Sequence, residues 1–280
     1  SLMKFLSYNI QYGKGQKGKH NLYRVAEVIK EADIVCLQEI EKFWQRSGFV
    51  DQAQILSEFL PKFYSVYGPA LDMDASLKNE YGQISNRRRQ FGNMILSRYP
   101  IISTRNFPLP KQGTGPDPEH SIQRALLETV INIPGLGYTR VYSTHLSHRN
   151  PKSRFPQIQF MMRRINQAPH EQGAWSGEHT DTGWTEGEKP PMPQQFILMG
   201  DMNFKLDSKE YKEMVDSEDF YDAWKSKDED RGTNVDGDSI DHCFVSKNLL
   251  PKIERTYIDR NITASDHWPL WMEMNAENKN

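Results

Sequence analysis

The 280-residue sequence has few cysteines, almost no net charge and no long apolar segment. Its two cysteines exclude a disulfide-rich scaffold, and both lie in short apolar runs typical of buried, reduced thiols. No apolar run approaches the roughly 18 residues that span a bilayer, so we expect no transmembrane segment. The 35 Lys and Arg residues against 37 Asp and Glu residues give a net charge of −2, which excludes a strong basic field for tight non-specific binding of nucleic acid.

The composition, with 37% hydrophobic and 26% charged residues, is typical of a soluble globular protein. It excludes a fibrous chain and a wholly disordered one. The first residues contain no positively charged segment followed by an apolar core, so we expect a cytoplasmic protein, or a secreted one if a signal peptide has been removed. We also expect a monomer.

Short apolar strands alternate with a few amphipathic helices along the chain. The periodicity and the flanking residues predict helices at 21–31, 52–60, 153–166 and 207–215, the last with Asp207 as its N-cap. Many strands, few helices and no linker-like break predict a single α+β domain with two sheets over residues 3–275. The predicted strands are 4–10, 34–38, 63–67, 92–97, 125–133, 138–146, 195–199, 240–246, 253–258 and 268–274.

Residues 168–195 interrupt this pattern. They contain much Gly, Pro, Glu, His and Trp and have no apolar period, which predicts a long surface loop inserted into the domain. Trp175 and Trp184 could stack on a base, touch a lipid head group, or belong to a loosely ordered loop. The charge run at 87–89, Arg-Arg-Arg, is either solvated surface or a contact to a polyanionic substrate.

Side chains that can perform chemistry stand repeatedly where predicted strands end or begin. A polar group beside a buried strand is costly without partners, so six such places in one chain indicate a shared polar centre. Clustered carboxylates repel one another and call for a cation; oxygen ligands favour Mg²⁺ together with substrate phosphate oxygens, which indicates phosphoryl chemistry. The residues are Asn9, Glu39, His145, Asp201 with Asn203, Asp241 with His242, and Asp266 with His267.

The same pieces, in this order, resemble the endonuclease/exonuclease/phosphatase superfamily of metal-dependent phosphohydrolases. Each triplet alone is a weak signal, but the ordered set spans nearly the whole chain. The resemblance implies a four-layer α/β sandwich, in which two mostly antiparallel sheets lie face to face and helices flank them. The matching segments are Tyr8-Asn9-Ile10, Leu37-Gln38-Glu39, Thr144-His145-Leu146, Gly200-Asp201-Met202-Asn203, Ile240-Asp241-His242 and Ser265-Asp266-His267.

The resemblance also implies a metal site. Glu39 matches the principal Mg²⁺ ligand, Asn9 a neighbour that holds a metal-bound water or a ligand carboxylate, and Asp266 a residue on the metal side. Mn²⁺ is the expected substitute in an assay. The nuclease branches often place an Asp where this sequence has Gln11, and the neutral amide there weakens the abasic-endonuclease interpretation.

Five residues match catalytic positions of the family. The resemblance implies that Asp201 orients or deprotonates the attacking water, that Asn203 bonds a non-bridging phosphate oxygen, and that His145 donates to the phosphate as negative charge builds. Asp241 would pair with His267 and fix its tautomer, while His267 would bind phosphate or act as base. Whether Asp201 or the Asp241–His267 pair is the general base stays open.

Further positions near the phosphate are less specific. Asn93 and Arg124 resemble family residues that face the site, and an arginine suits forked recognition of phosphate oxygens. His242 either lines the site or caps its strand. The remaining histidines lack a supporting pattern and are expected at the surface: His20, His120, His148, His170 and His179.

Together these observations predict an enzyme that hydrolyses a phosphoester, preferably a phosphodiester, by in-line attack of an activated water. The substrate stays open between nucleic acid, a lipid head group as in a sphingomyelinase-like enzyme, and a small molecule, and a phosphomonoester is an alternative. Two alternatives come from other classes. One is a non-catalytic binding protein on the same fold, and the other is a zinc hydrolase built on His145, His242 and His267.

Overall fold

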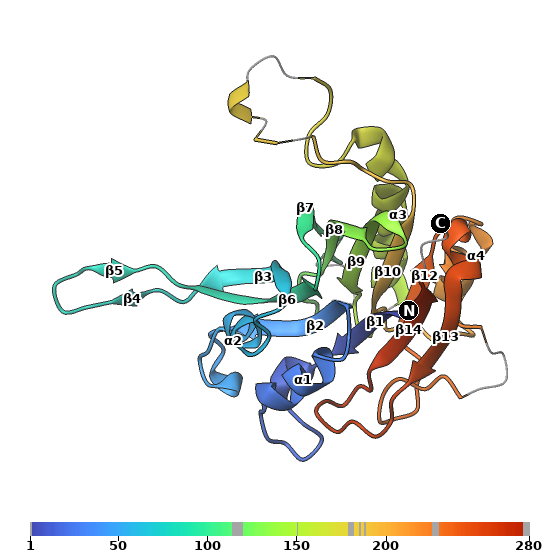
Figure 1. Cartoon of the computed structure of the whole chain (residues 1–280). Coiled ribbons are helices and arrows are strands. Elements are labelled where there is room, and N and C mark those ends of the chain that lie inside the picture. Colours follow the sequence, from blue (N-terminus) through green and yellow to red (C-terminus); the bar gives the residue numbers. More distant parts are fainter. Residues whose placement is uncertain are drawn as a thin grey trace.

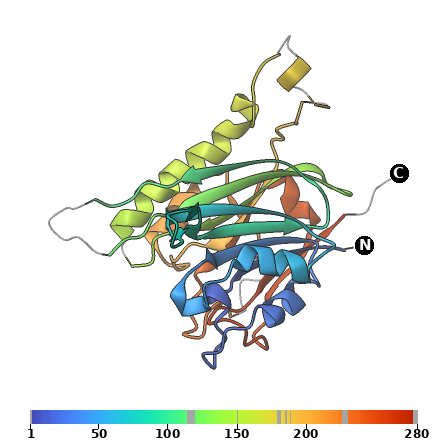
Figure 2. The ribbon, with the colours of Figure 1, turned by 90° about the vertical axis from the view of Figure 1, so that its left-hand side faces the viewer.

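Two six-stranded sheets lie face to face in the computed structural model, which describes residues 2–113, 120–149, 151–178, 182–184, 186–187, 189–225 and 230–276 (Figures 1 and 2). The first sheet has the order β13 (Ile253–Ile258), β14 (Leu270–Asn275), β1 (Leu2–Asn9), β2 (Ile34–Lys42), β6 (Arg88–Ser97) and β3 (Tyr64–Asp74). The second has the order β11 (Tyr221–Asp222), β12 (Asp241–Val245), β10 (Phe196–Asp201), β9 (Gly137–His145), β8 (Ala125–Ile133) and β7 (Ile101–Pro108).

Each sheet contains one parallel pair, β1 with β2 in the first and β9 with β10 in the second. The other pairs within the two sheets are antiparallel. The prediction of two mostly antiparallel sheets is therefore confirmed. Because parallel strands point to the same edge, the end of β1 lies beside Gln38 of β2, and the last residues of β9 and β10 lie side by side.

The central strands are buried on both faces, which explains why they appear in the sequence as continuous apolar runs rather than as alternating ones. Between the sheets, Phe5 and Cys36 pack in one cluster with Val141 and Met199. A side chain of this size contributes about 1.5–3 kcal/mol when it is fully buried. The sandwich interior is thus closed by apolar packing, and polar groups collect at its edge.

Helices cover the two outer faces and complete the four predicted layers (Figure 2). On the first sheet, α1 (Leu22–Ile29) and α2 (Gln52–Phe59) pack in one cluster with the outward side chains of β1 and β2. On the second, α3 (Pro151–Glu171) and α4 (Lys209–Asp216) pack against β9, β10 and β12. None of the described helices is both long enough and apolar enough to cross a membrane. Short 3₁₀ helices are η1 (Gln11–Gly13), η2 (Gln45–Ser47), η3 (Thr182–Trp184) and η4 (Lys247–Lys252).

Several predicted boundaries were wrong. The N-cap of α4 is Ser208, whose side chain accepts from the amide of Tyr211, and not Asp207. The long helix α3 includes Pro156 and continues past Pro169 to Glu171, so the first residues of the predicted loop 168–195 are helical. Strand β7 was not predicted. In the rest of that loop, residues 179–181, 185 and 188, including His179, lie outside the described part of the chain.

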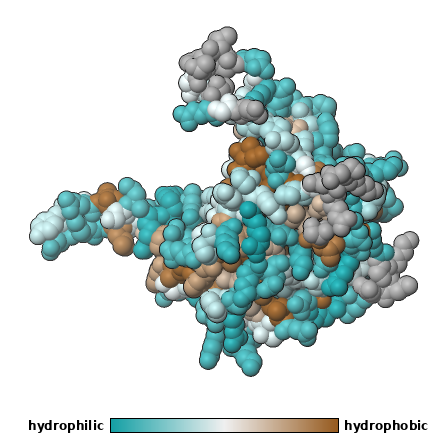
Figure 3. Space-filling view, viewed as in Figure 1, coloured by the Kyte–Doolittle hydropathy of each residue, from teal (hydrophilic) through white to brown (hydrophobic). Residues whose placement is uncertain are grey.

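Strands β3 and β6 run beyond the sheet into an arm that also carries the small hairpin β4 (Leu77–Lys78) and β5 (Ile84–Ser85) (Figure 1). Figure 3 shows apolar side chains exposed on this arm, where Leu77 is 57% and Ile84 63% accessible. The predicted arginine run lies here, and Arg88 pairs with Asp72 of β3 at 2.9 Å. Local contacts within the arm therefore account for at least part of this run.

Candidate active site

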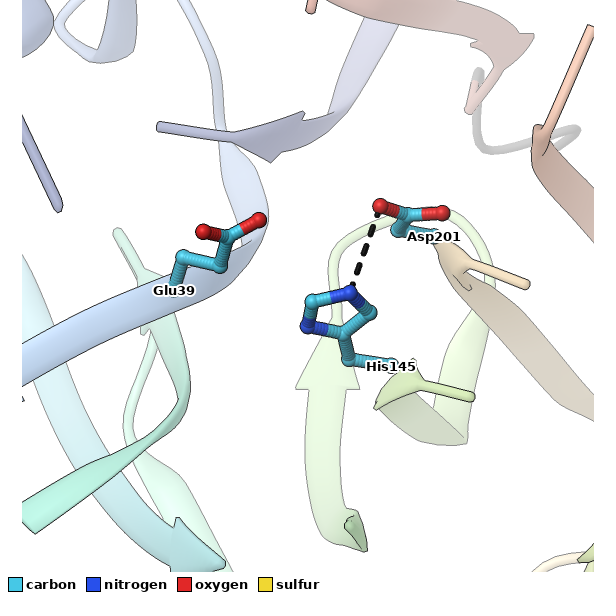
Figure 4. A group of neighbouring side chains, drawn as sticks. All are labelled: Glu39, His145 and Asp201. Atoms are coloured by element: carbon cyan, nitrogen blue, oxygen red, sulfur yellow. Dashed lines mark ion pairs between the residues drawn. The ribbon is translucent and has the colours of Figure 1, made fainter. Parts of the chain in front are cut away.

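The polar residues predicted from the sequence converge at one edge of the sandwich. Asn9 is the last residue of β1 and pairs with Gln38, the neighbour of Glu39 on β2. On the facing sheet Asp201 pairs with His145 on one side and with Asp241 on the other. Figure 4 shows Glu39 from the first sheet and the pair His145–Asp201 from the second as neighbours. The strand ends thus bring six segments of the chain to one place.

Asn9 connects the two sheets. Its fully buried amide nitrogen donates to Oε2 of Glu39 and, at 2.9 Å, to Oδ2 of Asp201. Its amide oxygen accepts from the backbone N–H of Gln11 at 2.9 Å, and its backbone carbonyl accepts from the Ser265 hydroxyl at 2.6 Å. With each polar group of its side chain occupied, Asn9 fixes the spacing between Glu39 and Asp201.

Glu39 stands on an irregular backbone. The register between β2 and β6 shifts between Leu37 and Ile40, and Glu39 adopts a φ of +58°. A positive φ is unfavourable for a residue with a Cβ, and such strain collects where a fold must direct a side chain to a site. A bulge re-aims the side chain of an otherwise regular strand. Here it accompanies the Glu39 carboxylate that meets Asn9.

Asp201 lies between two histidines. Its Oδ2 is 3.4 Å from Nε2 of His145 and 3.5 Å from Nε2 of His267, and only 2% of the residue is exposed. Burial alone would raise the pKa of Asp201, but His267, His145 and the hydrogen bond from Asn9 hold this pKa below its usual range. Asp201 is therefore an ionised carboxylate at neutral pH.

His267 and Asp241 form a buried pair in which Nδ1 of the ring is 2.7 Å from Oδ2 of the carboxylate. Burial lowers the pKa of His267, but the carboxylates of Asp241 and Asp201 outweigh it and raise this pKa well above the usual value. Burial also raises the pKa of Asp241, whose Oδ1 has no hydrogen-bond partner among the described residues. The two groups share a proton as a unit, with the ring held by its Nδ1.

His145 is paired differently. Nη1 of the buried Arg124 is 2.9 Å from Nδ1 of the imidazole. Burial and the Arg124 charge lower the pKa of His145, so the ring is neutral near pH 7. Arg124 Nη1 is farther from Nε2, at 3.3 Å, and Nε2 is also 3.4 Å from Oδ2 of Asp201. Because an arginine can only donate, the nearer nitrogen, Nδ1, accepts, and the ring proton belongs on Nε2 beside Asp201. The site thus contains one neutral and one protonated histidine.

Asn203 follows Asp201 on a left-handed backbone, with a φ of +58°. Its N–H donates to Oδ1 of Asp201 at 3.1 Å, and its amide nitrogen donates to the carbonyl of Leu146 at 2.8 Å. Its Oδ1 is 3.2 Å from Nδ1 of His148. His148 is exposed, as predicted, but it borders the site. In the sequence, only its position three residues after His145 indicated that it could lie there.

The remaining predicted residues occupy the margin. Half-buried Asp266 has its pKa raised by burial, with the charges of Glu39 and Asp201 adding to the effect. With its amide oriented to suit its neighbours, Gln11 donates to Oδ1 of Asp266 at 3.3 Å, so it supports this carboxylate where other branches have an acid. Asn93 lies opposite the β2 bulge, donates to the carbonyl of Ala125 at 3.1 Å and leaves its buried Oδ1 without a partner among the described residues.

His242 belongs to the core rather than to the site. Its ring stacks on Phe204 at 4.8 Å and its Nε2 is 2.7 Å from the Phe204 carbonyl oxygen. Burial lowers its pKa to about 4. Adjacent residues of a strand point to opposite faces, so His242 turns away where Asp241 turns in. The three histidines of the zinc alternative are therefore not brought together.

Among the described residues, two groups of side chains could hold a metal ion. Ligand atoms of Glu39, His145 and Asp201 lie within 4.8 Å of one another, and so do those of Asp201, Asp241 and His267. In the first group two of the three ligands are carboxylates, and oxygen ligands suit a hard cation. The Asn9 amide nitrogen donates to both carboxylates and so holds them in position. The donor set at Glu39 therefore fits a divalent ion of this kind.

Comparison with known proteins agrees with this arrangement. The model of the endonuclease/exonuclease/phosphatase family matches residues 6–267. Solved structures with this fold include a family protein from Beutenbergia cavernae DSM 12333, 20% identical with a TM-score of 0.69 over 98% of this chain and 71% of that one. A family protein from Bacteroides vulgatus is 19% identical with a TM-score of 0.67 over 99% and 100% of the two chains. A mannosyl-6-phosphatase from Bacteroides thetaiotaomicron VPI-5482 is 18% identical with a TM-score of 0.63 over 98% and 99%.

No curated protein matches the chain. At these low identities the solved structures establish the shared fold alone. The family model, in contrast, covers nearly the whole chain, from the first strand to His267. The chain belongs to the endonuclease/exonuclease/phosphatase family.

Proposed function

We propose that this protein is a metal-dependent hydrolase that cleaves a phosphodiester by in-line attack of a water molecule. Family membership supports a hydrolase of phosphoesters in general. The observation that carries the finer proposal is the position of Asp201, an ionised carboxylate between a neutral and a protonated histidine and linked through Asn9 to Glu39. A carboxylate, two proton donors and a metal-binding acid are the groups that phosphoryl transfer requires.

In this proposal Glu39 holds the ion, with Asn9 and Asp266 beside it. The best candidate is Mg²⁺, with Mn²⁺ as a substitute, and when bound it acts as a Lewis acid on a phosphate oxygen. Its charge would also offset the mutual repulsion of Glu39, Asp201 and Asp266, which adds to burial in raising the pKa of Asp266. A bound divalent ion would thus supply a counter-charge to these carboxylates.

The protein side chains supply position and proton transfer. Asp201 orients the attacking water and takes its proton as the new P–O bond forms. Protonated His267, fixed by Asp241, and the Nε2–H of His145 donate to the oxygens on which negative charge builds. Arg124 keeps His145 in the tautomer that can donate, and Asn203 lies beside Asp201 for a further phosphate contact.

The charge of the site favours a diester over a monoester. Among the site residues described above, Arg124 and His267 carry positive charge. Glu39, Asp201 and Asp241 carry negative charge. A phosphodiester carries one negative charge, whereas a monoester carries up to two near neutral pH. With a divalent ion added, these charges sum to about +1, which a singly charged diester neutralises and a doubly charged monoester exceeds. The fold neighbour that is a mannosyl-6-phosphatase keeps the monoester as the second candidate.

The test is hydrolysis with added Mg²⁺ of bis-p-nitrophenyl phosphate, plasmid DNA, single-stranded RNA, sphingomyelin, inositol polyphosphates and mannose 6-phosphate. We expect a diester to be cleaved best, and Glu39→Gln, Asp201→Asn and His267→Ala each to lose most activity while circular dichroism stays unchanged. The exposed residues Glu213 and His170 provide matched controls as Glu213→Gln and His170→Ala. Near wild-type turnover by all three site variants would refute the proposal, and a monoester cleaved best would overturn the diester preference.

A further inference from the structure

An arginine and three aromatic rings lie beside the proposed metal site. The guanidinium carbon of Arg46 is 3.9 Å from the ring centre of Tyr12, 5.2 Å from that of Trp44 and 5.7 Å from that of Phe91. We call these four residues the aromatic–arginine cluster. Tyr12 lies in η1, Arg46 in η2, Trp44 just before η2, and Phe91 in β6. A guanidinium held among ring faces loses little further freedom on binding a ligand.

Arg46 is anchored from one side. Its Nε donates to both carboxylate oxygens of Glu41, at 3.2 and 3.1 Å, and its Nη2 donates to Oε2 at 2.7 Å. The Ser47 hydroxyl adds a bond to Oε1 of the same carboxylate at 2.6 Å. Glu41 is fully buried, yet 46% of the Arg46 side chain is exposed, and its Nη1 has no hydrogen-bond partner among the described residues. Nη1 therefore remains able to donate to an anion outside the pair.

The cluster borders the catalytic centre. The ring of Phe91 is 6.5 Å from the ring of His145. Phe91 thus lies near both Arg46 and His145 of the candidate site. Tyr12 adopts a φ of +43°, so the chain accepts backbone strain where this ring meets Arg46. An oriented cation thus stands at the margin of the site that contains His145.

We propose that Arg46 binds a second anionic group of the substrate, beside the scissile phosphoester, and so favours substrates that carry two phosphates. The inference rests on the proposed function, because it takes the scissile phosphate to lie among Glu39, His145 and Asp201. Arginine binds phosphate oxygens through fixed N–H groups, and a charge-assisted hydrogen bond of this kind is stronger than one between neutral groups. Arg46 is therefore a specificity-determining residue.

The experiment compares thymidine 3′,5′-bisphosphate with thymidine 5′-monophosphate and thymidine 3′-monophosphate, by calorimetric titration in Mg²⁺. We expect the wild type to bind the bisphosphate about tenfold or more tightly than either monophosphate. Arg46→Gln should narrow this gap to about twofold, and Arg46→Lys should keep part of it. Because Arg46→Gln leaves the buried Glu41 unpaired, the double variant Glu41→Gln/Arg46→Gln repeats the measurement with a neutral pair.

Arg88→Gln on the arm is the control, since Arg88 is an exposed arginine that is also paired with a carboxylate. It should keep the full wild-type gap. Equal affinities of the wild type for the bisphosphate and the monophosphates would overturn the inference. So would an affinity ratio that stays at the wild-type value in Arg46→Gln and in the double variant. The binding readout needs no turnover. Absence of phosphoester hydrolysis therefore counts against the proposed function, and a missing affinity gap counts against the role of Arg46.

Discussion

The buried imidazole of His242 should make the stability of the protein fall as the pH drops below neutrality. In the folded chain burial lowers its pKa from 6.5 to about 4. In the unfolded chain the ring takes up a proton near pH 6.5. Between these two values the unfolded state binds the proton and the folded state does not. The free energy of unfolding is therefore unaffected by this group above about pH 6.5 and declines as the pH falls from there towards 4.

The size of the effect follows from the same shift. Lowering the pKa from 6.5 to about 4 corresponds to roughly 3 kcal/mol once both states are protonated. Between about pH 7 and pH 5 the loss due to His242 is roughly 2 kcal/mol. The ring is fully buried, so little solvent screening reduces this figure. An effect of this size is a large fraction of the stability of an ordinary domain.

The assay is urea unfolding of the wild type and of His242→Gln at both pH values, with EDTA present so that metal binding does not contribute. The glutamine does not titrate and retains a donor for the Phe204 carbonyl, which His242 now contacts at 2.7 Å. We expect the wild type to lose about 2 kcal/mol more than the variant on going to the lower pH. His170→Gln, at an exposed position, should behave like the wild type. Equal losses in the wild type and in His242→Gln would show that the folded ring takes up its proton freely.

Two further predictions concern the site and the fold. Asp241→Asn removes the carboxylate that holds Nδ1 of His267, so kcat for a diester should fall by about 10²–10⁴, with KM changed far less; a pH–rate profile identical to that of the wild type would contradict this role. Arg140→Met deprives the carbonyls of Ile165, Pro193 and Gln194 of a buried donor, so the free energy of unfolding should drop by roughly 3 kcal/mol or more; thermal melts of both proteins measure it, and an unchanged melting temperature would contradict it.

Much of the fold could be predicted because local patterns encode it. The apolar runs of β1, β2, β9 and β10 and the helical spacing of Val25, Ala26 and Ile29 required no knowledge of their partners. Strand β7 was missed because its side chains are only half-buried or exposed, so no apolar run marks it. The end of α3 was missed because the residues from 168 onward have no apolar period and contain much Gly and Pro. Proline in the last turn removes one hydrogen bond, and the packing of the remaining helix outweighed that cost.

The sequence could predict the orientation of these side chains only in part. The alternation of a strand shows that Asp241 and His242 cannot both face one site. It does not show which of them turns inwards, because this depends on where the second sheet lies. The positive φ of Glu39 has no signature in the residue types around it, since a bulge depends on the partner strand.

The sequence by itself determined which groups would meet: the acids, amides and imidazoles that follow buried strands could be satisfied only by one another or by a cation. The tertiary structure alone decided how they meet. Asn9 reaches Glu39 in its own sheet and Asp201 in the facing sheet, and Arg124 rather than a carboxylate sets the tautomer of His145. These contacts depend on the spacing and stagger of two packed sheets, which no local pattern in the chain specifies.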